Sequence, residues 1–211
     1  MCLRLELRMG ARELNRQMPG LHFARRDLPP GGEICAESLA PMIAHGLKPC
    51  LEPARWGLVG NFLDRPPAQP LLAMPVEGLL SRPFYKHLFL HRRCLVPATA
   101  VIMGKTPADE EIRLRPAAGG ALMLAAIYDQ HPLVGTSFAL LTLGPGGHPH
   151  AGPRRTPFVI AGAEQAAWLD ETLLLDEAAL AAWLAFSQAL PWQTDYLPPP
   201  PRSPQLAFQF A

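Results

Sequence analysis

The middle of the chain carries a compact apolar segment, Arg93-Cys94-Leu95-Val96-Pro97-Ala98, which runs into a second apolar stretch over residues 98–103. Short apolar runs bounded by turn residues are typical of buried β-strands. Further strand candidates lie on both sides, at residues 2–8, 55–59, 111–115, 121–128, 137–143 and 157–160. The first of these alternates leucines with charged residues, the pattern of a half-buried strand. We therefore expect a mainly β structure built around residues 93–103.

Helices are fewer, and the pattern predicts them at residues 82–91, 164–169 and 177–189. In the last of these, Leu180, Ala181, Trp183 and Leu184 form a stripe that would face the core. Residues 9–33 are expected to be loop with one short helix. Strands that dominate, with helices inserted among them, predict an α+β fold: a single compact domain with a β-barrel-like mixed sheet and peripheral helices.

Composition limits the domain count and the kind of partner. The 211 residues, 49% of them hydrophobic, are enough for one sizeable core, so we expect one domain over residues 1–211. A Pro-rich tail is predicted at about residues 191–211, with 206–210 as a candidate edge strand. The formal charge is only +1, which excludes a protein that holds nucleic acid by bulk charge. Any nucleic-acid site must then be a local patch.

The sequence favours a cytoplasmic protein without a membrane partner. Charged residues interrupt the N-terminal segment where a signal peptide needs an apolar run, and no stretch reaches the roughly 18–20 apolar residues of a membrane span. The four cysteines show no metal-binding spacing, and Cys35, Cys50 and Cys94 are expected to be buried thiols. His87 and His91 have helical metal-ligand spacing but no third ligand. No metal or cofactor is predicted.

Several motifs resemble those of the SOS response-associated peptidase (SRAP) family, in the family's order and spacing. They are Met1-Cys2-Leu3-Arg4-Leu5, residues 55–62 (Arg-Trp-Gly-Leu-Val-Gly-Asn-Phe), Ala73-Met74-Pro75-Val76-Glu77, residues 93–104 (Arg-Cys-Leu-Val-Pro-Ala-Thr-Ala-Val-Ile-Met-Gly) and residues 150–157 (His-Ala-Gly-Pro-Arg-Arg-Thr-Pro). The resemblance covers nearly the whole chain. It implies the family's compact α+β domain with a barrel-like core and peripheral helices.

The resemblance also implies a chemistry for Cys2. Once Met1 is removed, Cys2 offers an amine and a thiol on adjacent carbons, and an α-amine with a pKa of about 7.7–8.0 is partly free base at neutral pH. Such a pair can trap the aldehyde of an abasic sugar as a thiazolidine. The implied partner is single-stranded DNA with abasic sites, and the "peptidase" activity resembles self-removal of Met1.

Three positions depart from the family pattern. The family's assisting asparagine, arginine and glutamate are replaced by Ala73, Pro75 and Met103, none of which can transfer a proton. The family histidine aligns with His150, with His148 as the alternative, and Glu77 matches a second family glutamate. The predicted catalytic residues are thus Cys2, His150 and Glu77. Whether the chain is still an enzyme stays open at this point.

Candidate DNA contacts lie in the same motifs. Arg4, Arg154 and Arg155 can hold phosphates as bidentate donors, and Trp56 can stack an exposed base. Solvated surface arginines and a core tryptophan are the alternative interpretations. Three functions follow: an abasic-site crosslinker, a DNA-binding module without chemistry, and a protein-interaction domain without a DNA role.

Overall fold

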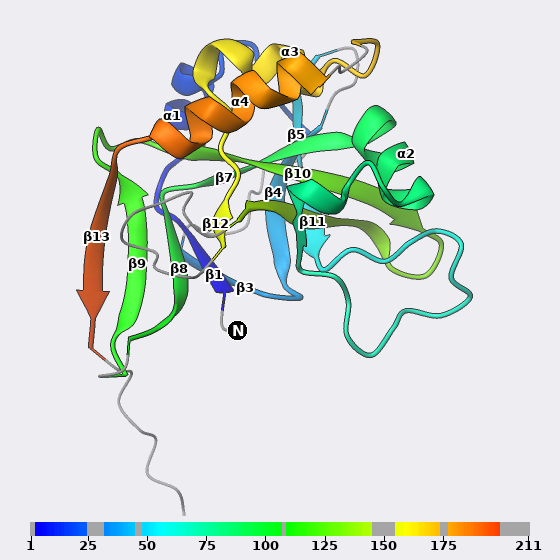
Figure 1. Ribbon diagram of the computed structural model, residues 1–211, viewed down its shortest axis with the longest axis horizontal. Helices are drawn as coiled ribbons and strands as arrows, with labels where there is room; N and C mark the ends of the chain where they lie inside the picture. Colours follow the sequence, from blue (N-terminus) through cyan, green and yellow to red (C-terminus); the bar gives the residue numbers. More distant parts are fainter. Residues whose placement is uncertain are drawn as a thin grey trace, which may run out of the picture.

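The apolar segment at the centre of the sequence is strand β7 (Arg93–Ala98), and all its residues are buried. In the computed structural model, which describes residues 3–24, 32–44, 48–106, 109–144, 155–173 and 177–198, β7 lies between two antiparallel neighbours. These are β10 (Leu122–His131) and β4 (Leu39–Ala44) (Figure 1). β7 is buried because it is the middle strand of the core, as its unbroken apolar sequence predicts.

Five of the described strands close into a barrel. β4 pairs with β5 (Cys50–Trp56), which pairs in parallel with β11 (Gly135–Leu143), which returns to β10. Short strands extend the margins: β2 (His22–Phe23) beside β5, and β6 (Ala73–Pro75) and β12 (Thr156–Pro157) beside β11. The predicted barrel-like mixed sheet is confirmed.

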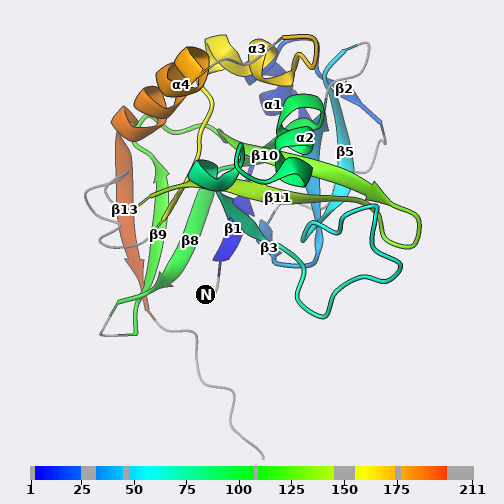
Figure 2. The same cartoon turned by 45° about the vertical axis from the view of Figure 1, so that its right-hand side comes forward.

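The chain continues from the same central strand into a second sheet. Beyond Thr99 the chain continues as β8 (Ala100–Lys105), which leaves the barrel and pairs with β1 (Leu3–Leu7) and β9 (Glu111–Pro116). The Thr99 hydroxyl holds the crossing by donating to the Glu6 carbonyl and accepting from the Arg8 amide, each at 3.0 Å. The edge strands are β3 (Gly32–Cys35) and β13 (Trp192–Leu197) (Figure 2).

Strand β13 lies inside the segment predicted as a Pro-rich tail. It pairs with β9 along its length, and Asp195 bonds Arg113 and Arg115, both at 2.9 Å. The candidate edge strand at 206–210 lies outside the described residues.

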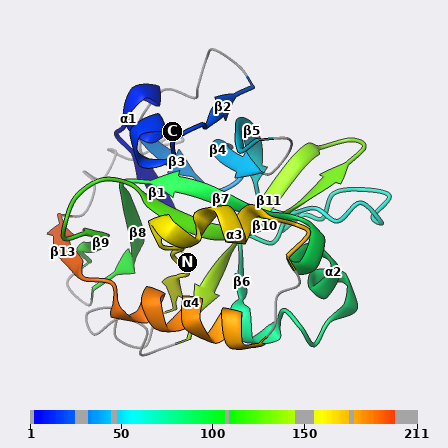
Figure 3. The same ribbon diagram turned by 90° about the horizontal axis from the view of Figure 1, so that it is seen from above.

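Helices cover one end of the barrel, as seen from above in Figure 3. The described α-helices are α1 (Ala11–Gln17), α2 (Pro83–His91), α3 (Gln165–Leu169) and α4 (Glu177–Ala189), with 3-10 turns at Val76–Gly78 and Gly162–Glu164. All three helices predicted individually are present, and α1 is the short helix expected within residues 9–33. None of the described helices is long and apolar enough to cross a membrane.

Trp168 of α3 joins the helices to the barrel. Its indole is fully buried, meets Phe158 and Trp183 nearly edge-on, and donates to the Cys94 carbonyl of β7 at 2.9 Å. This tryptophan satisfies its N–H while burying a large apolar surface.

The expectation of three buried cysteines is wrong for Cys35 and Cys50 and right for Cys94. Cys94 is buried in β7, and burial raises the pKa of its thiol well above the ordinary value. Cys50 is partly exposed, and Cys35, the last residue of edge strand β3, is exposed. An edge strand has solvent on one side, which the local sequence around Cys35 does not reveal.

Candidate functional site

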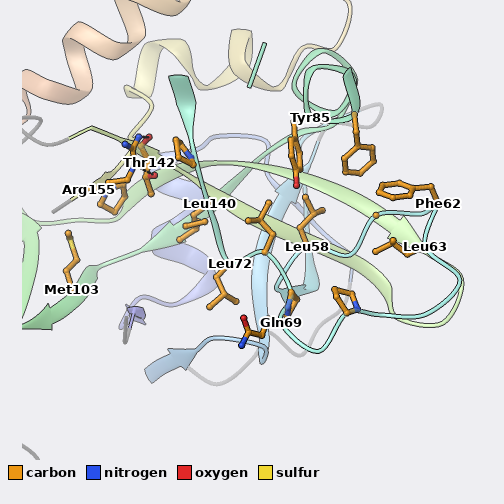
Figure 4. Close-up of a pocket in the computed structure, with 18 of the residues that line it drawn as sticks. Leu58, Phe62, Leu63, Gln69, Leu72, Tyr85, Met103, Leu140, Thr142 and Arg155 are labelled. Carbon is orange, nitrogen blue, oxygen red and sulfur yellow. Dashed lines mark hydrogen bonds between the residues drawn. The ribbon is translucent and has the colours of Figure 1, made fainter. Parts of the chain in front are cut away.

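A cleft of about 800 Å³ lies between the barrel and the loop that joins β5 to β6 (Figure 4). One wall is that loop, residues 57–72, and the other is made by β11, β12 and the first turn of α2. The end of β8 closes it on the side of the second sheet. Most lining side chains are apolar, including Leu58, Leu63, Leu71, Leu72 and Leu140.

Polar contacts fix the 57–72 loop over the cleft. The backbone amide of Asn61 donates to the buried Asp129 carboxylate at 2.8 Å, and that of Val59 donates to the Ser137 hydroxyl at 3.0 Å. The buried His131 accepts the Leu133 amide on Nδ1, so its proton is on Nε2, which donates to the Leu63 carbonyl at 2.7 Å. These anchors, all on β10, β11 and the turn between them, position the loop.

The three departures from the family pattern converge at one end of this cleft. Ala73, Pro75 and Met103 all line it, although they come from two strands in different sheets. Strand β1 begins at the same place, because Leu3 pairs with Met103. Cys2, His148, His150 and Arg154 lie outside the described residues.

Arg155 and Glu77 form an ion pair beside this end of the cleft. Arg155 also donates to the Thr142 hydroxyl at 2.9 Å and to the Thr142 carbonyl at 2.8 Å. Partial desolvation works against ionisation of Glu77, but hydrogen bonds from its own backbone amide and from Arg155 outweigh it and lower the pKa of the carboxyl. Glu77 is therefore an anion at neutral pH, which can accept a hydrogen bond but is a weak base and cannot act as an acid.

Arg4 and Trp56 both make contacts inside the protein that stabilise the fold. Arg4 of β1 pairs with Glu33 at 3.0 Å and with Glu111. Trp56 is fully buried, lies parallel to Phe138, and donates its indole N–H to the Leu72 carbonyl at 2.9 Å. The core interpretation therefore holds for Trp56, since no face of its ring is open to a nucleic-acid base.

The other end of the cleft is aromatic, and sequence reasoning did not single it out. Phe62 from the loop meets Phe84 of α2 nearly edge-on, with ring centroids 4.8 Å apart, and Phe84 contacts Tyr85 at 5.3 Å. Phe62 is 65% exposed. The available signal was Phe62 itself, a large aromatic residue at the end of the Arg55–Phe62 motif and in a loop with three prolines.

Comparisons with known proteins agree with this architecture. A family model described as SOS response associated peptidase (SRAP) matches residues 1–195. No curated protein matches the chain. Among solved structures, a Bordetella bronchiseptica protein is similar with a TM-score of 0.71 and 12% identity, covering 93% of this chain and 100% of that one.

Two further solved structures have the same fold. A Bacteroides thetaiotaomicron protein has a TM-score of 0.73 and 14% identity, covering 92% of this chain and 91% of that one. A phage-related protein of Bordetella bronchiseptica has a TM-score of 0.67 and 16% identity, covering 92% of this chain and 94% of that one. At such low identities the likeness concerns the fold alone.

Proposed function

The chain belongs to the SOS response-associated peptidase family, and we propose that it acts at damaged DNA, binding single strands and trapping abasic sites through Cys2 after Met1 is removed. The observation that carries the proposal is the pairing of Leu3 with Met103. Through this pairing β1 begins at the end of the cleft that Met103 lines, beside the group formed by Arg155, Glu77 and Thr142. The reactive residue is bonded directly to that starting point.

The chemistry needs little beyond Cys2. Its free α-amine attacks the ring-opened sugar aldehyde and expels water, giving a Schiff base. The thiol then adds to the carbon–nitrogen double bond and its proton moves to nitrogen, closing a thiazolidine. The net reaction joins aldehyde and aminothiol with loss of one water. His150 is the proposed proton carrier, and Glu77, as an anion, is proposed to accept a hydrogen bond near the amine.

Phosphate contacts are proposed for Arg4, Arg154 and Arg155. The two that the structure describes already pair with carboxylates, Arg4 with Glu33 and Glu111, and Arg155 with Glu77. Binding a phosphate must then displace or share these partners, so we expect weak binding that salt reduces further. Trp56 has no part in this proposal, because it is buried.

A second candidate function is a DNA-binding module without chemistry. The observation that favours it is the lining at the Cys2 end of the cleft, where Ala73, Pro75 and Met103 supply no proton donor or acceptor side chain. In this case Cys2 is kept as a strand residue and the strand is held without a covalent bond.

The intact mass of the protein, alone and after incubation with a single strand carrying one abasic site, tests the proposal. We expect a mass without Met1 and a denaturant-stable adduct equal to protein plus strand less one water. Cys2→Ala should abolish the adduct. Cys35→Ser is the matched thiol control and should keep it, because Cys35 is exposed but has no adjacent α-amine. If Cys2 protein with a free amine forms no adduct, crosslinking is wrong and the binding module remains.

A further inference from the structure

We infer that the cleft is a binding site for an uncharged, flat and mainly apolar small molecule, and that this binding requires neither DNA nor Cys2. The inference goes beyond the proposed function, which uses only the Cys2 end of the cleft. It rests on three properties of the described lining: its size and apolarity, its lack of net charge, and its aromatic end.

The size and chemistry of the cleft suit a small organic ligand. Its volume of about 800 Å³ lies within the roughly 300–1,000 Å³ typical of ligand sites, which are mostly apolar with a few polar groups. Leucines line the middle of both walls, namely Leu58, Leu71 and Leu72 on the loop side and Leu140 on β11. Water in such a space finds few hydrogen-bond partners, so an apolar molecule that displaces it gains free energy.

The electrostatics select against a charged ligand. Among the described lining residues, Arg155 is the charged one, and its guanidinium is neutralised by Glu77 and occupied by Thr142. A phosphate or carboxylate placed among the leucines in the middle of the cleft, away from Arg155, would be buried without a cation to pair with it, which is strongly unfavourable. The replacement of polar family positions by Ala73, Pro75 and Met103 extends the apolar wall to the Cys2 end. An uncharged molecule pays no such cost.

The aromatic end selects for a flat ring. Phe62, Phe84 and Tyr85 all line the cleft there, with neighbouring ring planes inclined at 78° and 60°. Gly60 permits this arrangement, since a Cβ at that position would lie 2.5 Å from the Phe62 ring. Figure 4 shows the Tyr85 hydroxyl directed into the cleft, where it can bond a carbonyl or hydroxyl of the ligand.

The uncharged, flat probe N-phenyl-1-naphthylamine, whose fluorescence rises in apolar sites, tests the inference. We expect saturable one-site binding to the full-length protein. Phe62→Ala should weaken it about tenfold, because an aromatic contact is worth up to about 1.5 kcal/mol. The matched control is Phe186→Ala on α4, where the phenylalanine is also exposed but lies outside the cleft lining; it should leave affinity unchanged.

Two further variants separate this inference from the proposed function. Met103→Glu adds a charge to the lining and should also weaken the probe about tenfold, with circular dichroism showing that it still folds. Cys2→Ala should bind the probe normally even though it cannot crosslink. The inference is overturned if the wild-type signal does not saturate, or if Phe186→Ala loses as much affinity as Phe62→Ala. Phe62 is exposed, so its variant is expected to fold whatever happens to Met103→Glu.

Discussion

Arg93 shows how one buried charge holds several elements together. It is fully buried at the start of β7, and its guanidinium donates to the carbonyls of Phe89 and Leu90 at 2.9 Å, of Trp168 at 2.6 Å, and of Asp170. These carbonyls belong to the C-terminal ends of α2 and α3, where the helix dipoles favour a cation. Burial lowers the pKa of Arg93, but an arginine stays protonated at neutral pH.

Replacing this arginine should strongly destabilise the fold. In Arg93→Met the apolar stem is kept while the carbonyl partners lose their donor, so we expect a loss of about 3–5 kcal/mol in the free energy of unfolding. Urea denaturation measures it. Arg55→Met, which removes an exposed pair with Glu37 at 3.0 Å, is the control and should cost less than about 1 kcal/mol. Equal losses of unfolding free energy in the two variants would show that Arg93 does not hold β7, α2 and α3 together.

At the scale of elements, the buried Asp129 is one of the three side chains that anchor the 57–72 loop over the cleft. Asp129 accepts from the Asn61 amide at 2.8 Å and from Arg92 at 2.6 Å, so it binds the loop to β10 and to the residue after α2. A loop of this length without helix or strand stays ordered only where its backbone groups find such partners.

Asp129→Asn should loosen this loop without unfolding the barrel. One carboxylate oxygen accepts from Arg92 and from Gln130 N–H, and the other accepts from Asn61 N–H alone, so the amide NH₂ loses fewest hydrogen bonds when it faces Asn61. We expect the Asn61 amide to exchange its hydrogen roughly tenfold faster, since the lost bond is worth about 1.4 kcal/mol. Amides of the barrel strand β7 should keep their exchange rates. An unchanged Asn61 rate would contradict the anchoring role.

The sequence allowed most regular elements to be predicted, but not how they meet. Periodicity identified β1 and α4, because each has the repeating apolar pattern of one buried face, and β7 was identified by its continuous apolar run. Strand β13 escaped notice because its residues are only partly buried and its stability comes from Asp195 and its arginine partners in β9. The local apolar pattern cannot reveal a strand whose stability depends on side chains of another strand.

For the candidate site too, some residues could be predicted from the sequence and their arrangement could not. The family resemblance predicted roles for Cys2, Glu77 and Arg155, which stay predictions, and the ion pair between the last two was not foreseen. The cleft itself could not be predicted, because Phe62, Ala73 and Met103 are distant in sequence and meet only after the barrel closes and β8 crosses into the second sheet. Burial of Trp56 likewise depends on the parallel pairing of β5 with β11.

For the whole molecule, the two sheets should unfold as one unit. They share the continuous segment from β7 to β8, and one hydrophobic core to which Leu5 of β1, Leu114 of β9 and Leu95 of β7 all contribute. A change in the protonation of one buried group on either sheet is therefore expected to shift global stability rather than to open one sheet alone.

Tyr128 of β10 provides the test on the alkaline side. Burial, reinforced by nearby Glu171, raises its pKa from 10.0 to about 12. The unfolded chain loses this proton near pH 10, while the folded protein retains it to about pH 12. Stability from this group is thus intact below pH 10 and falls as the pH rises from about 10 to about 12. The urea midpoint of Tyr128→Phe should fall less over that range than that of the wild type. Tyr196→Phe, which changes a tyrosine that is 54% exposed, should follow the wild type. An equally steep fall in Tyr128→Phe would mean that other groups set the alkaline limit of this fold.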